Sequence, residues 1–273
     1  RALARSLTPL LGQPVLVENK TGALGAVGAA EVARAAPDGY TVLITTQGSL
    51  TETPVLTPST PYDPLTAFAP VTMIGESPLV LFAHSSFPAN DVKGLIDYAR
   101  SKPDGIDLSV TGSSVKLGAF ALAGAADIKI VQVPYTGQGP AMNAALGGHT
   151  PLGLNTGSTV LTQHVQAGRL KLLGVGSAKP YPLMPGVPTI AQTVPGYEAK
   201  AWWALFAPAG TPEDAIRRLN QAFRTALAEP AIEELFAANA VVPLTSTPAE
   251  LKAAVTGGLA QTRALVAKYG IKE

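Results

Sequence analysis

Four short loops in this sequence combine hydroxyl, amide and glycine residues directly after an apolar run that predicts a β-strand. They occupy residues 45–49 (TTQGS), 111–114 (TGSS), 135–139 (YTGQG) and 155–158 (NTGS). Such residues donate neutral hydrogen bonds, and the second and third loops lead into predicted helices, whose N-termini favour negative charge. In parallel sheets, ligands bind outside the carboxyl ends of the strands. The pattern therefore predicts a shared site for a small anion.

The predicted donors in these loops are uncharged. None of the four loops contains arginine or histidine, and the nearest candidate cation is Lys116. A hydrogen bond to a charged acceptor contributes roughly 1.5–3 kcal/mol, so several neutral donors can replace an ion pair. Bridging waters can extend their reach. The predicted ligand contacts are Thr46, Gln47 and Ser49 from the first half of the chain, and Ser113, Ser114, Thr136, Gly137 and Asn155 from the second. The same residue types also build ordinary turns.

The side chains needed for covalent or metal chemistry are missing from the sequence or scattered along it. There is no cysteine, which excludes thiolate ligands, cysteine nucleophiles and disulfides. The three histidines, His84, His149 and His164, lack the spacing of a helical zinc motif. No nucleophile elbow, phosphate-binding loop or paired-carboxylate motif is present. We therefore predict no catalytic residue, no metal site and no cofactor.

The composition and one glycine pattern exclude further classes of protein. Hydrophobic residues make up 47% of the chain and charged residues 14%, which indicates packed cores rather than disorder. A net charge of +1 with no basic run argues against nucleic-acid binding. Glycines at positions 22, 25 and 28 differ in spacing from a dinucleotide fingerprint and favour close packing of a helix on a strand.

Apolar runs alternate with helical patterns through most of the chain, which predicts an α/β fold with helices on parallel sheets. Strands are expected at 15–17, 41–45, 70–75, 78–84, 108–111, 128–135, 151–155, 171–177 and 202–208, and long amphipathic helices from Thr211 onward. We expect domain 1 to comprise residues 1–82 and 205–273, and domain 2 residues 83–204. Two crossing strands, near 80–83 and 201–206, would form the hinge.

Several long segments resemble the tripartite tricarboxylate transporter receptors, also called Bug proteins. They are residues 14–49 (beginning PVLVENKTGALGAVGAAE), 68–75 (FAPVTMIG), 133–149 (VPYTGQGPAMNAALGGH), 167–212 (beginning AGRLKLLGVGSAKPYP) and 246–251 (STPAEL). The resemblance covers essentially the whole chain, in order and at family-like spacing. It is therefore more specific than any single motif.

The resemblance implies a type-2 periplasmic binding fold, with two α/β domains of mixed or parallel sheet, two crossing strands and a ligand cleft between the domains. It implies a periplasmic, non-enzymatic and monomeric receptor. The receptor would capture a di- or tricarboxylate, an acidic amino acid or an aromatic carboxylate and deliver it to the membrane permease subunits of a tripartite tricarboxylate-type transporter. Two alternatives are a ligand-sensing effector domain and an α/β enzyme that uses the glycine-rich loop.

Two features depart from the family pattern. Family members usually begin with a strand and a proline- and glycine-rich loop that contacts ligand, whereas Arg1 starts at the helix that follows. We expect that an upstream segment, including a signal peptide, has been removed. That segment would contain half of the anion site in domain 1. In addition, Thr150 and Pro151 replace the acidic residue that usually follows the Gly-Gly pair.

Overall fold

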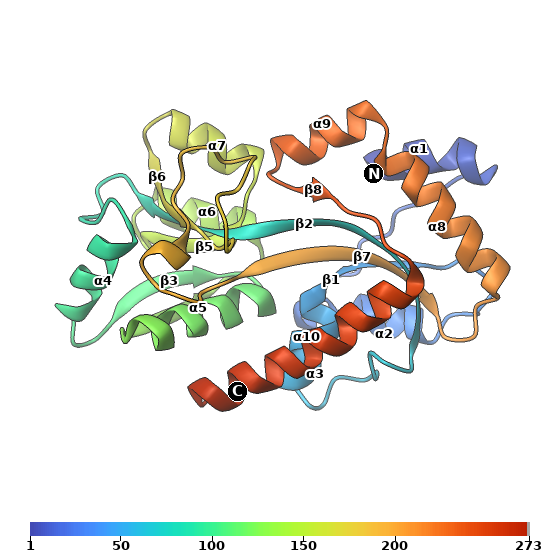
Figure 1. The fold of residues 1–273 in the computed structure, drawn as a ribbon, viewed down its shortest axis with the longest axis horizontal. Coiled ribbons are helices and arrows are strands. Elements are labelled where there is room, and N and C mark those ends of the chain that lie inside the picture. The colour runs from blue at the N-terminus through green and yellow to red at the C-terminus, as the bar shows by residue number, and fades with distance from the viewer. Residues whose placement is uncertain (272–273) are drawn as a thin grey trace. The chain divides into compact units, whose positions relative to one another are not determined.

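The computed structural model describes residues 1–271, and the chain divides into two compact units (Figure 1). Unit 1 comprises Arg1–Glu76, Trp202–Ala237 and the chain from Val242 onward, and unit 2 comprises Ser77–Ala201 and Ala238–Val241. Strands β2 and β7 each pass from one unit to the other. The short segment Ala238–Val241 adds a further excursion that was not expected. The domain boundaries expected from the sequence, with domain 2 at residues 83–204, stay a prediction.

Unit 1 is built from the two end portions of the chain. Its elements are α1 (Ala2–Leu11), the 3-10 turn η1 (Ala23–Gly25), α2 (Ala26–Ala33), β1 (Leu43–Thr46), the π-helix η2 (Gly48–Glu52), α3 (Thr53–Leu56), the start of β2 (Phe68–His84), most of β7 (Lys200–Pro208), α8 (Glu213–Leu227), α9 (Pro230–Ala238), β8 (Val242–Pro243) and α10 (Pro248–Tyr269). Helix α10 begins with a capping box, in which Thr247 and Glu250 each accept from the other's backbone N–H.

The core of unit 1 lies on both faces of β7. Strand β7 pairs antiparallel with β1, and β8 pairs antiparallel with β2. Leu205 packs with Leu7 of α1 and Phe223 of α8, and these two helices lie side by side (Figure 1). The next residue, Phe206, packs with Leu251 of α10 on the opposite face. Successive residues of a strand face opposite ways, so β7 holds two layers of helices together.

The expected strand at 15–17 does not form. Leu16 is 85% exposed and Val17 43% exposed, and the segment makes no strand pairing. Among residues 1–271, β1 pairs only with β7, and Ile44 on β1 is 51% exposed. A short apolar run becomes a strand only when a neighbouring strand accepts its backbone hydrogen bonds, and residues 15–17 have no such neighbour.

Unit 2 is built around a mixed sheet in the order β6-β2-β5-β3-β4. Its elements are the rest of β2, α4 (Val92–Arg100), β3 (Ile106–Val110), α5 (Ser113–Ala126), β4 (Ile130–Pro134), α6 (Gln138–Leu146), β5 (Leu152–Thr156), α7 (Thr159–Gln166), β6 (Leu170–Val175) and η3 (Ile190–Gln192). Strand β3 is parallel to β4 and β5, and β2 is antiparallel to β5 and β6. The runs at 70–75 and 78–84, expected as two strands, form the single strand β2.

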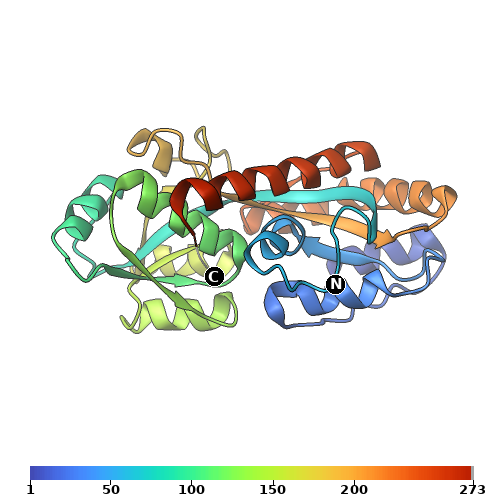
Figure 2. The ribbon, with the colours of Figure 1, turned by 90° about the horizontal axis from the view of Figure 1, so that it is seen from below.

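Helices cover both faces of this sheet (Figure 2). Val80 and Phe82 of β2 pack with Met142 of α6 and Leu161 of α7. Leu79 lies on the other face, where it approaches Gly118 of α5. This arrangement follows from the right-handed crossovers of parallel strands, because β3-α5-β4 and β4-α6-β5 step in opposite directions along the sheet. No helix within residues 1–271 is long and apolar enough to cross a membrane.

Candidate functional site

Three of the predicted binding loops meet at one edge of the unit 2 sheet. Val110 of β3 is opposite Pro134 of β4, and Leu108 of β3 is opposite Leu152 of β5, so the carboxyl ends of the three strands lie nearly level. The Tyr135 N–H donates to the carbonyl of Val110 at 2.9 Å, which joins the loop after β4 to the end of β3. The structure therefore brings together the predicted contacts Ser113, Ser114, Thr136, Gly137 and Asn155.

Side chains of the loop after β5 tie the three loops to one another. The Asn155 Nδ2 donates to Thr111 Oγ1 at 3.0 Å, and Asn155 Oδ1 accepts from the Thr156 N–H at 3.0 Å. The Gln138 Nε2 donates to the Thr156 carbonyl at 2.9 Å. Asn155 is 8% exposed, and both polar atoms of its side chain have partners within the unit. These hydrogen bonds attach the Asn155 side chain to the loop after β3 and to its own backbone. Thr111 and Gln138 lie in the predicted loops but were not among the predicted contacts.

Two helices begin at this edge with glycine as the N-cap. Gly112 precedes α5 and Gly137 precedes α6, and neither helix has a side-chain cap. Helix α7 differs, because Ser158 Oγ accepts from the Leu161 N–H at 3.2 Å. First-turn N–H groups lack acceptors within their own helix and carry partial positive charge. A β-carbon on Gly112 or Gly137 would contact nothing within 4 Å, so the space before both helices is open.

The two serines at the start of α5 and the threonine before α6 differ in exposure. Ser113 is 3% exposed, Ser114 is half-buried and Thr136 is exposed. Ser114 and Thr136 are thus the more accessible of these residues, and each lies next to a helix N-terminus. This edge of unit 2 can offer a small anion two helix N-termini and several hydroxyl donors.

The three predicted contacts in unit 1 lie at the end of β1 and just after it. Thr46 ends the strand, and Gln47 Nε2 donates to Glu52 Oε1 at 2.8 Å. Ser49 is 2% exposed, and its Oγ donates to the Leu24 carbonyl at 3.2 Å. The hydroxyl of Ser49 therefore holds the glycine-rich turn at 22–25 against the loop after β1. Thr46 and Gln47 are half-buried.

Two buried groups in this part of unit 1 were missed by the sequence analysis. Glu52 is 2% exposed at the end of the π-helix. The Tyr62 hydroxyl donates to the Ser49 carbonyl, and burial raises the pKa of the Tyr62 phenol to about 12. Residues 51–66 carry no clear hydrophobic period, so the sequence pattern did not mark either side chain as buried.

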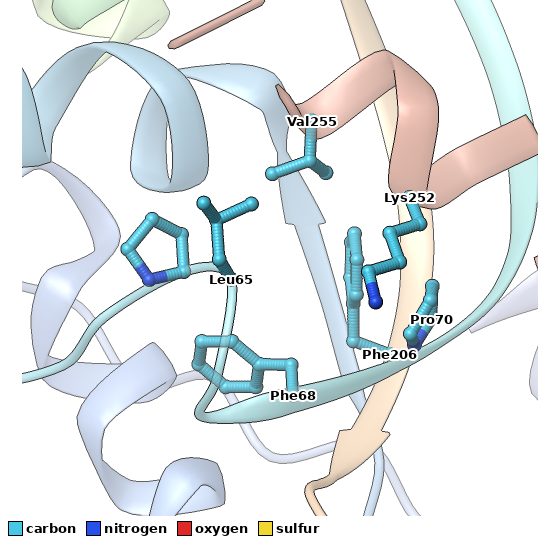
Figure 3. A pocket seen from close by; sticks show the side chains of 7 residues that line it. Leu65, Phe68, Pro70, Phe206, Lys252 and Val255 are labelled. Carbon is cyan, nitrogen blue, oxygen red and sulfur yellow. The ribbon is translucent and has the colours of Figure 1, made fainter. Parts of the chain in front are cut away.

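A hollow in unit 1 is lined by none of the predicted contact residues (Figure 3). It is lined by Pro64, Leu65, Phe68, Pro70, Phe206, Lys252 and Val255. Phe68 and Phe206 form an edge-to-face pair with ring centroids 6.1 Å apart, and both rings are buried. This hollow is the open side of the aromatic core beneath α10. Within residues 1–271, no group of three or more histidine, aspartate or glutamate side chains could hold a metal ion.

Comparison with known proteins identifies the family. Residues 1–271 match the tripartite tricarboxylate transporter family receptor model. The periplasmic binding protein BugD is 33% identical, with a TM-score of 0.91 over 100% of this chain and 92% of BugD. Rpa4515 of R. palustris, solved with adipate, is 28% identical, with a TM-score of 0.93 over 99% of this chain and 91% of that one. MatC of Rhodopseudomonas palustris, solved with bound malate, is 28% identical, with a TM-score of 0.88 over 97% and 92%.

These matches confirm the resemblance and the periplasmic binding protein fold with its mixed sheet. They favour a receptor over the α/β enzyme alternative, because the family consists of non-enzymatic solute-binding receptors. The chain belongs to the tripartite tricarboxylate transporter receptor family, and it is a periplasmic solute-binding protein.

Proposed function

We propose that this receptor captures a small organic acid at the strand-end loops and delivers it to the membrane subunits of a tripartite tricarboxylate-type transporter. The observation that carries the proposal is the meeting of two uncapped helix N-termini, of α5 and α6, at one edge of the unit 2 sheet. Relatives of the same fold were solved with malate and with adipate, both of which are dicarboxylates.

The proposed chemistry of recognition is a carboxylate held by neutral donors. Each helix N-terminus favours an anion by about 0.3–1 kcal/mol, and more when partly buried. The hydroxyl groups of Ser114 and Thr136 add hydrogen bonds to a charged acceptor, each contributing about 1.5–3 kcal/mol. Because none of these donors demands the bidentate geometry of an arginine, the site accepts acids of different shape.

The remaining predicted contacts take more specific roles in the proposal. Ser113 and Gly137 contribute backbone N–H groups, and Asn155 positions the loops around them. In unit 1, Thr46 and Gln47 are proposed contacts for the ligand. Ser49 supports the loop after β1, because its hydroxyl already donates to the Leu24 carbonyl.

A thermal-shift screen against organic acids tests the function. Malate, adipate, citrate, glutamate and benzoate cover the classes considered, and at least one of them is expected to raise Tm. A ligand that binds only the folded state at 100 times its Kd stabilises it by about 2.7 kcal/mol. Adipamide has the length of adipate without its charge and is the matched control. A shift with adipamide equal to that with adipate, or shifts only with uncharged solutes, would contradict an anion site.

Single hydroxyl deletions test the neutral-donor mechanism. Ser114→Ala and Thr136→Ala are each expected to raise Kd about tenfold, which corresponds to about 1.4 kcal/mol. Arg169→Ala is the matched control, because Arg169 is an exposed cation outside the loops and its removal should leave Kd within about twofold. Titration calorimetry measures all three. The mechanism is wrong if Arg169→Ala abolishes binding while both hydroxyl variants bind normally.

A further inference from the structure

Residues Ala238–Val241 form a short segment of unit 2, although most of α9 before it and all of β8 after it belong to unit 1. We call these four residues the clamp segment. Ala240 is 5% exposed and has φ of 52°, a left-handed conformation that residues with a side chain rarely adopt. The chain is therefore folded tightly here and is not a loose linker.

The clamp segment contacts the first residue of α7. The Thr159 N–H donates to Asn239 Oδ1 at 3.3 Å, and Thr159 Oγ1 donates to Asn239 Oδ1 at 3.2 Å and to the Ala238 carbonyl at 3.3 Å. Ser158 caps only the Leu161 N–H of this helix. Asn239 thus satisfies a first-turn donor that the local sequence leaves without an acceptor.

The clamp segment also packs on the loop between β5 and α7. The Tyr181 hydroxyl donates to the Ala240 carbonyl at 3.0 Å. A β-carbon on Gly157 would lie 2.5 Å from Ala240 Cβ, 2.7 Å from Met184 Cε and 3.3 Å from the Asn239 carbonyl oxygen. The contact is too close for any side chain, so Gly157 is held between the clamp segment and Met184.

Gly157 directly follows the two residues that tie the proposed binding loops together. Asn155 reaches Thr111 after β3, and the Thr156 carbonyl accepts from Gln138 at the start of α6. Residues 155–159 are therefore attached at one end to the proposed site and at the other end to the clamp segment.

We propose that the clamp segment positions the β5–α7 loop for ligand binding, with Asn239 and Tyr181 as positioning residues that do not touch the ligand. The proposal rests on the proposed function. A loop that must be ordered when ligand binds lowers affinity, because the lost freedom opposes association. Holding residues 155–159 in place beforehand removes that cost.

The test compares variants that remove or keep the acceptor. Asn239→Ala deletes Oδ1, whereas Asn239→Asp keeps an oxygen that accepts from Thr159 and suits a helix N-terminus. Tyr181→Phe deletes the hydroxyl that donates to Ala240. Asn220→Ala is the matched control, since Asn220 is equally half-buried and its Nδ2 donates to the Val71 and Ser246 carbonyls within unit 1.

Two readouts separate positioning from general stability. Amide hydrogen exchange of residues 155–162 in the ligand-free protein should be about tenfold faster in Asn239→Ala and Tyr181→Phe, and unchanged in Asn239→Asp and Asn220→Ala. Calorimetry with malate and with adipate should show Kd raised about fivefold to tenfold in the first two variants and changed by less than about twofold in the others.

The outcomes are distinguishable. Unchanged exchange in Asn239→Ala overturns the clamp, and faster exchange with unchanged Kd overturns its positioning role. If Asn239→Asp fails to restore both readouts, the Oδ1 contacts are not the cause. If the unmodified protein binds neither acid, the proposed function fails for these ligands, while the exchange measurements still support or overturn the clamp.

Discussion

Replacing Gly137 by aspartate is expected to abolish binding of the organic acid while stabilising the ligand-free protein. Gly137 is the N-cap of α6, its φ of 170° is extended backbone that any residue adopts, and a β-carbon there has open space. An N-cap carboxylate accepts from first-turn N–H groups and adds about 0.5–1 kcal/mol over glycine. The same carboxylate occupies the proposed position of the ligand's carboxylate. We expect Kd to rise at least a hundredfold, about 2.7 kcal/mol.

Two control variants separate charge from capping and position. Gly137→Asn supplies a neutral cap and should weaken binding less than the aspartate does. Thr247→Asp adds the same charge at the N-cap of α10, which Thr247 already caps, and should leave Kd unchanged. Calorimetry gives Kd and thermal unfolding gives stability for each variant. Normal binding by Gly137→Asp would show that the N-terminus of α6 is not the anion position.

The meeting of the three polar loops at one edge of the unit 2 sheet could be predicted from sequence because each signal is local. The short strand at 106–110, followed by Thr111-Gly112-Ser113, places a turn and a helix start within a few residues, and the parallel arrangement then brings such loops to one edge. The alternation along β7 follows from the strand itself, because successive residues face opposite ways. Trp202 packs beside Phe206 in one layer of unit 1, and Trp203 packs against the other.

The features that sequence reasoning missed depend on contacts between distant residues. The side chain of Ser49 resembles the other loop hydroxyls in sequence, and only the position of Leu24, which is 25 residues away, shows that it is occupied. The left-handed Ala240 has no sequence signature, since alanine has the highest helix propensity and the segment reads as the end of α9. The apolar run at 15–17 has strand composition, but strand formation depends on a neighbour that residue types alone do not reveal.

Substituting alanine for Gly153 is expected to destabilise unit 2 strongly. Gly153 of β5 is directly opposite Phe82 of β2, and an added β-carbon would overlap the Phe82 ring, with Cε1 and Cε2 both at 2.7 Å. Phe82 is 1% exposed and packed by Met142, Leu161 and other apolar side chains, so its ring has no space into which to move. Overpacking of a close-packed core costs about 1–3 kcal/mol and sometimes more. We expect Gly153→Ala to fall at or above the upper end of that range.

The Gly153–Phe82 pair can be tested with a double-mutant cycle in urea unfolding. Phe82→Leu alone should cost roughly 1–2 kcal/mol through the cavity it leaves. Combined with Gly153→Ala, it provides space for the new methyl group, so the double variant should be more stable than the sum of single effects predicts by at least about 1 kcal/mol. Gly139→Ala is the control, because a β-carbon there meets nothing within 4 Å and alanine favours the helix.

Two signals follow the unfolding of the variants. Both tryptophans lie in unit 1, so their fluorescence reports whether unit 1 unfolds with unit 2, while circular dichroism follows both units. Additive single effects would show that the ring of Phe82 does not limit the size of residue 153, and that the register of β5, which carries Asn155 to the binding loops, is maintained by other contacts.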